Sequence, residues 1–149
     1  RRLKPAVVVG FGGYPTVQDF RFGQQVEVSY TPGKTFLMYT SRSWILDEQG
    51  QPVRPAAVET GYWRAHPDQP VELLLAHPTG YVEIWLGTVD GAKVELATDM
   101  VARTSTAKEY TAGHRLYGLV EHDLLWAFDM AAVGQPLQAH LSARLKRVS

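Results

Sequence analysis

Turn-forming residues divide this chain at short and regular intervals, and this spacing limits the folds open to it. Between the turns lie runs of β-branched and aromatic residues, at 26–30, 35–44, 61–64, 71–77, 81–86, 93–98, 114–120, 123–133 and 140–148. Most turns contain glycine, and the pair Asp90-Gly91 is a typical two-residue hairpin signal. Many short strands at this spacing are typical of an antiparallel sandwich or barrel.

Alternation within the runs favours the barrel. Leu124, Trp126, Phe128 and Met130 share one face of a strand, and the opposite face is also fairly apolar. One face can therefore line a cavity while the other is partly covered. Eight to ten strands in 149 residues suit a small closed barrel, which has room for one small ligand.

We therefore expect an all-β, antiparallel closed barrel in a single domain, residues 1–149. A short helical turn is expected near residues 17–20. Residues 54–57, which contain Pro55, are expected to form a surface loop.

Composition excludes several classes of function. Fifteen Lys and Arg residues balance fifteen Asp and Glu residues, whereas nucleic-acid binders normally carry a basic excess. The chain has no cysteine, which excludes disulfides, thiolate metal sites and a cysteine nucleophile. No apolar run approaches the ~20 residues of a membrane-spanning helix, and no signal peptide opens the chain. We expect a cytoplasmic protein with no nucleic-acid or membrane partner, and its first residue, Arg1, suggests that the chain begins inside a longer precursor.

The five histidines are the side chains that ordinarily titrate near neutral pH. His66 and His122 stand in turns and are expected to be exposed, while His114 opens a strand and carries little signal. His77 precedes the turn Pro78-Thr79-Gly80, and we expect it to donate to a turn carbonyl.

His140 follows a turn that fixes the direction of the last strand. A single neutral imidazole can hold haem iron, because the porphyrin supplies four further nitrogens. Ser142 and Arg144 share its face by simple alternation, however, so the residue pattern on its own favours an exposed strand histidine.

Other catalytic signals are weak. No two carboxylates are spaced for glycoside hydrolysis, and no Gly-x-Ser-x-Gly elbow is present. The glycine cluster at 10–13 lacks the Gly-x-Gly-x-x-Gly pattern of a dinucleotide site. Arg103, Lys108 and Arg115 could form an anion-binding rim, although solvated strand ends also explain them.

Several motifs resemble those of the nitrobindin family. Gly13-Tyr14-Pro15-Thr16, followed by Phe20, is similar to the family's Tyr-Pro-Thr motif. Further similar blocks follow in the same order along nearly the whole chain, at 33–37, 59–64, 75–84, 102–109 and 130–141.

The resemblance implies a roughly ten-stranded antiparallel barrel of the calycin type, similar to fatty-acid-binding proteins. It implies haem b in the barrel mouth, with His140 as the iron ligand and with Thr16 and Met130 in contact with haem. A ferric form that isomerises peroxynitrite to nitrate is implied as well, with His140 as the catalytic ligand, and a ferrous form that binds nitric oxide. The expected partners are small molecules, and a homodimer is one option for assembly.

A non-enzymatic carrier of a small hydrophobic or fatty-acid-like molecule is the alternative. Ala6 stands where the family motif has a tryptophan, which leaves room for a barrel without haem. Such a carrier would use a buried cation near the barrel mouth to hold a carboxylate, and Arg103 and Arg115 are the candidates. A third reading, an inert interaction module, has little support from the residues.

Overall fold

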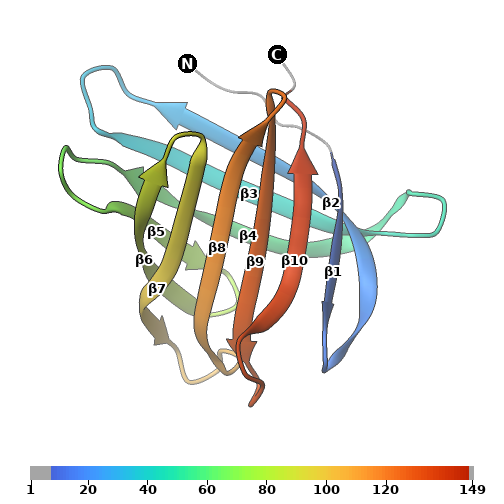
Figure 1. Cartoon of the computed structure of the whole chain (residues 1–149). Coiled ribbons are helices and arrows are strands. Elements are labelled where there is room, and N and C mark those ends of the chain that lie inside the picture. Colours follow the sequence, from blue (N-terminus) through green and yellow to red (C-terminus); the bar gives the residue numbers. More distant parts are fainter. Residues whose placement is uncertain (1–7, 148–149) are drawn as a thin grey trace.

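The computed structural model describes residues 8–147, which form ten antiparallel strands. In chain order these are β1 Val8–Tyr14, β2 Val17–Tyr30, β3 Phe36–Leu46, β4 Pro52–Arg64, β5 Val71–His77, β6 Tyr81–Asp90, β7 Lys93–Arg103, β8 Tyr110–Val120, β9 Asp123–Ala132 and β10 Gln138–Leu145. Each strand pairs with the next along the chain, and β1 pairs with β10 to close the barrel (Figure 1). The expected antiparallel, ten-stranded closed barrel is confirmed. Within residues 8–147, no helix is long and apolar enough to cross a membrane.

This up-and-down topology gives the barrel two distinct ends, because successive connections lie at opposite ends. We call the end with the β1–β2, β3–β4, β5–β6, β7–β8 and β9–β10 connections the lower end. The other connections define the upper end. Figure 1 shows β9–β10 at the bottom and β8–β9 at the top.

Alternating side chains fill the interior. Leu73 and Trp85 are fully buried and Leu96 is nearly so. Trp126 and Phe128 on β9 are also buried, as their alternation predicts. The interior is therefore a packed core in its middle, and the spaces that remain lie toward the two ends.

The expected helical turn at residues 17–20 is wrong. β2 begins at Val17, which pairs with Tyr14 directly across the Pro15-Thr16 turn. Phe20 and Phe22 then point to the same, inner side of the barrel with the period of a strand.

The expected surface loop at residues 54–57 is also wrong, because these residues belong to β4. Pro55 pairs with Trp44 between two shifts in the β3–β4 register. Proline lacks a backbone N–H, and a bulge is one of the few places where a sheet accepts it.

β1 was not among the expected strands, because its glycines interrupt the run of β-branched and aromatic residues that indicates a strand. A Cβ atom on Gly10 would lie 2.3 Å from the ring of Phe22, and one on Gly12 would lie 2.3 Å from the ring of Phe20. The glycines therefore let two core rings pack directly on the β1 backbone. Ala6 lies outside the described residues.

Candidate functional site

Two adjoining hollows open inside the lower end of the barrel, and we call them together the lower cavity. Their volumes are about 480 and 260 Å³, and the larger hollow is within the usual range for small-molecule sites. The two hollows share part of their lining, namely Ala56, Ala57, His77, Tyr81, Met130 and His140. Thr16, Met130 and His140, the three residues singled out from the sequence, all line the larger hollow.

A β-bulge directs His140 into this cavity. On β10, Ala139 pairs with Asp129 and Leu141 pairs with Phe128, so His140 is an extra residue between two consecutive partners. Bulges change the direction of side chains at such positions. His140 therefore faces inward beside Leu141, although alternation alone would place it outside with Ser142.

The hydrogen bond of His140 fixes which ring nitrogen carries the proton. Nδ1 lies 2.9 Å from the carbonyl oxygen of Gly13 on β1. A carbonyl can only accept, so Nδ1 donates and the lone pair of the neutral ring is on Nε2. This is the arrangement in which a histidine binds a metal through Nε2 while the second nitrogen sets its orientation.

The ring of His140 is also held by aromatic side chains. Its centroid lies 5.5 Å from that of Tyr14, 6.4 Å from that of Phe20 and 5.8 Å from that of Phe128, all edge-on. Burial lowers the pKa of His140, and the hydrogen bond to Gly13 opposes this only in part. The imidazole is therefore kept neutral, as metal binding requires.

Tyr14 on β1 connects this ring to β9, the strand on the other side of β10. Its hydroxyl donates to the carbonyl of Met130 at 3.0 Å and accepts from the backbone N–H of Ala132 at 2.9 Å. Met130 is half-buried and lines both hollows, whereas Thr16 is exposed in the β1–β2 turn. The structure thus brings together residues from both ends of the chain.

His77 does not donate to a turn carbonyl, so that expectation is wrong. Its Nε2 lies 2.6 Å from a carboxylate oxygen of Glu83, and its Nδ1 lies 3.9 Å from Glu59. Tyr81 stacks on the ring with the centroids 4.0 Å apart. The imidazole is buried, and its polar partners are carboxylates of the neighbouring strands β4 and β6.

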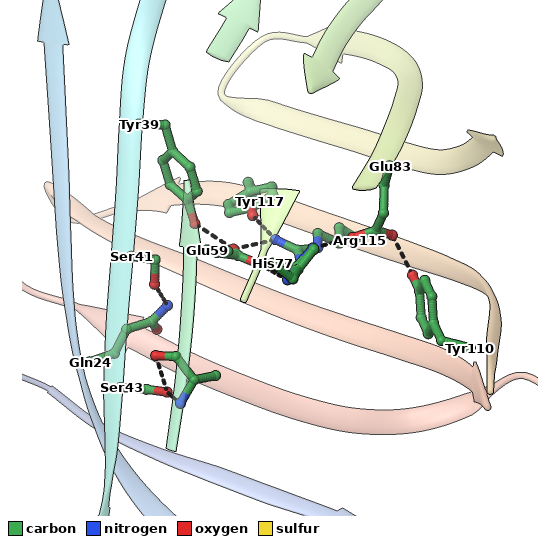
Figure 2. A network of polar contacts seen from close by, with 11 residues as sticks. Gln24, Tyr39, Ser41, Ser43, Glu59, His77, Glu83, Tyr110, Arg115 and Tyr117 are labelled. Carbon is green, nitrogen blue, oxygen red and sulfur yellow. Dashed lines mark hydrogen bonds and ion pairs between the residues drawn. The ribbon is translucent and has the colours of Figure 1, made fainter. Parts of the chain in front are cut away.

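A set of hydrogen-bonded side chains crosses the barrel and forms part of the wall of the lower cavity, and we call it the polar layer (Figure 2). It consists of Tyr39, Glu59, His77, Glu83, Tyr110, Arg115 and Tyr117. Arg115 donates to both carboxylate oxygens of Glu59, each at 2.8 Å. Burial alone would raise the pKa of Glu59, but the charge and hydrogen bonds of Arg115 outweigh it and lower that pKa to about 2.

No local sequence pattern pairs Arg115 with Glu59, because they are 56 residues apart. Alternation along β8 places Arg115 on the same face as Gly113 and Tyr117, which indicates that Arg115 is buried but not which residue it pairs with. Of the cations expected to bind a carboxylate or form an anion rim, Arg103 and Lys108 are exposed, and Arg115 is buried but already paired with Glu59.

A closed barrel with an inward histidine in an apolar cavity at one end defines a class of ligand-binding β-barrels. The chain belongs to the THAP4-like, heme-binding beta-barrel domain family, which matches residues 8–147. The resemblance to nitrobindins is thereby confirmed.

Its relatives carry two kinds of name. "Peroxynitrite isomerase" from Nocardioides sp. is 54% identical over 138 residues, which cover 93% of this chain and 84% of that protein. "Ferric nitrobindin-like protein" from Kineococcus radiotolerans is 55% identical over 144 residues, which cover 88% of this chain and 79% of that protein. The crystal structure of Rv2717c from M. tuberculosis is similar with a TM-score of 0.85 and 38% identity, covering 99% of this chain and 92% of that one.

Proposed function

We propose that the lower cavity holds haem b with Nε2 of His140 as the iron ligand. We further propose that the ferric form isomerises peroxynitrite to nitrate and that the ferrous form binds nitric oxide. The observation that carries the proposal is the bulged His140, whose Nδ1–H is fixed on Gly13 while Nε2 carries the lone pair. Membership in a family described as heme-binding and relatives named peroxynitrite isomerase support it.

The chemistry of the lower cavity fits such a group. Phe20, Phe128 and Met130 give apolar walls of the kind that a porphyrin ring packs against. Thr16 and Lys108 line the larger hollow and are exposed. Lys108 would supply positive charge for the haem carboxylates, and Thr16 would contact the haem near the β1–β2 turn.

The protein's part in the reaction is to bind and orient. When bound, ferric haem supplies a Lewis-acidic iron with one open coordination position. His140 would hold the iron through Nε2, and the hydrogen bond to the carbonyl of Gly13 keeps its ring from turning. The small side chains of Ala56 and Ala57 leave space on the cavity wall for a small anion. Peroxynitrite and nitrate contain the same atoms and carry the same charge, so the conversion uses no added proton or reductant.

Stopped-flow kinetics with the hemin-loaded protein test the activity. Loaded wild type should speed peroxynitrite decay and raise the yield of nitrate over nitrite, and His140→Ala should lose both effects. His66→Ala removes an exposed turn histidine and is the matched control, expected to behave as wild type. Equal rates with and without loaded wild-type protein would refute the isomerase activity.

We also propose that two copies associate through the outer face of β3–β7. Met38, Tyr62, Leu74, Ile84 and Met100 lie opposite one another in a single register line across these five strands. The two methionines and the tyrosine are exposed, and the zero net charge causes no repulsion between copies. Light scattering should give a dimer mass for wild type and a monomer mass for Tyr62→Glu. A monomeric wild type would contradict this assembly.

Two further expectations stay predictions: a single domain spanning residues 1–149 and a cytoplasmic location. Limited proteolysis should yield one resistant fragment if the first is correct. Fractionation of the host cells, with detection by antibody, tests the second.

A further inference from the structure

A second cavity lies inside the upper end of the barrel, away from His140. Its volume is about 400 Å³, and we call it the upper cavity. Residues near the β2–β3, β4–β5, β6–β7 and β8–β9 connections surround its mouth, among them Thr35, Ala65, Ala92 and Leu119. The volume is well above the ~150 Å³ that is sufficient for benzene in an apolar protein cavity.

A hydrogen-bonded wall separates the upper cavity from the lower one. Gln24 and Trp126 line both the upper cavity and the smaller lower hollow. The indole N–H of Trp126 donates to the Gln24 side-chain oxygen at 2.8 Å. The Gln24 amide donates to Ser41 at 2.8 Å (Figure 2). Both polar side chains of this wall already have partners, so we expect the wall to stay in place when either cavity is filled.

The upper cavity is lined almost entirely by apolar and aromatic groups. Arg64 is the one charged residue among the described residues that line it, and Arg64 is paired with Glu72 at 2.8 Å. The hydroxyl of Tyr39 donates to Glu59, and that of Tyr117 accepts from Arg115. Arg64 near the mouth is thus already paired with a carboxylate, and both hydroxyls near the base already take part in hydrogen bonds, which disfavours an anionic ligand.

The base of the upper cavity is a cluster of aromatic rings. Trp63 meets Tyr117 edge-on with the centroids 5.3 Å apart, and Tyr117 stacks on Trp126 at 6.0 Å. Tyr39 meets Trp63 edge-on at 6.4 Å. Such a cluster presents both ring faces and ring edges, which are the surfaces that a flat aromatic molecule contacts favourably.

We propose that the upper cavity is a second binding site, specific for a neutral, flat aromatic molecule of about two rings, and that it is occupied independently of the lower cavity. The proposal does not depend on haem binding in the lower cavity. It also differs from a fatty-acid carrier, because Arg115 is already bound to Glu59 and offers no charge to a carboxylate.

Equilibrium dialysis with the neutral, flat two-ring probe 2-methoxynaphthalene tests the site, before and after saturation with hemin. One equivalent should bind, with affinities within about twofold in the two states. The neutral 1-naphthol should displace the probe, whereas 1-naphthoate, which has the same ring system and a negative charge, should be at least ten times weaker.

Variants that fill one cavity or the other test whether the probe binds in the upper cavity. Val28→Trp fills it from β2 and should weaken probe binding at least tenfold, while hemin uptake stays as in wild type. Ala57→Trp fills the lower cavity and should do the reverse. Ala97→Trp adds the same bulk on the exposed side of β7 and should change neither. Circular dichroism checks that each variant folds. If Val28→Trp does not fold, Val94→Phe replaces it as the variant that fills the upper cavity.

Several results would overturn the proposal. They are the absence of probe binding, displacement of the probe by hemin, full binding to both filled variants, and equal competition by 1-naphthoate and 1-naphthol. Displacement by hemin would show that the probe occupies the lower cavity.

Discussion

The Nδ1 nitrogen of His140 donates to the carbonyl of Gly13, 2.9 Å away, and this bond joins the two strands at which the barrel closes. The residues are 127 positions apart in the chain. The candidate ligand is therefore oriented only when β1 and β10 are paired. Closure of the barrel therefore also sets the orientation of the His140 ring.

Hemin binding should depend on pH through His140. Metal binding needs the neutral imidazole, and burial lowers the pKa of His140 below its ordinary 6.5. Affinity should therefore fall as the ring gains a proton in acidic solution, and the midpoint of that fall should lie below pH 6.5. Hemin titrations across this range check it, and a midpoint above 6.5 would contradict the burial argument.

The Arg115–Glu59 pair should matter most when one partner is removed alone. Arg115→Met leaves the buried carboxylate of Glu59 without its cation, and such losses cost about 3–5 kcal/mol. The double variant Arg115→Met/Glu59→Gln removes both charges and should be clearly more stable than the sum of the two single losses. Urea unfolding measures the cycle. Additive effects would show that the two side chains are not coupled.

Acid should destabilise the protein through Glu59. Its pKa is lowered from 4.5 to about 2 in the folded state, so the folded protein binds this proton less readily than the unfolded chain. The stabilisation is fully present above about pH 4.5 and is lost as the pH falls toward 2, amounting to about 3 kcal/mol. The free energy of unfolding, measured at several pH values across this window, should fall less steeply with decreasing pH for the double variant than for wild type.

Two glycines of β8 should respond differently to one added methyl group. A Cβ atom on Gly113 would lie 2.5 Å from the ring of Trp85 and 2.8 Å from that of Phe128, whereas one on Gly118 meets nothing closer than 3.9 Å. Gly113→Ala should therefore cost about 1–3 kcal/mol, because the rings must move. Gly118→Ala should cause no loss. Calorimetry compares the two, and equal stabilities would contradict the packing described.

The strand pattern was predictable where alternation and turn chemistry agree. β5 follows its expected bounds, and Gly91, with φ of 59°, lies in the hairpin turn that Asp90-Gly91 indicates. β1 and the start of β4 were missed, because glycine and proline normally break strands. There the partner strands decided the outcome, through core rings that pack on Gly10 and a bulge that accepts Pro55.

The site was harder to derive from local patterns. Simple alternation places His140 outside the barrel, and only the one-residue bulge, which depends on pairing with β9, turns it inward. Periodicity predicted an exposed histidine, and only the resemblance of residues 130–141 to the family motif pointed to an inward His140. The Arg115–Glu59 pair had no local signature, because it joins strands far apart in the chain.

The most direct test of the account is a hemin titration of wild type and His140→Ala, followed by the visible spectrum, with His66→Ala as the control. Wild type and the control should show a sharp Soret band that saturates at one equivalent, and His140→Ala should lose or shift it. Saturating uptake with the same spectrum in all three proteins would contradict His140 as the iron ligand. Weak, unsaturable absorbance in wild type would contradict the haem site itself.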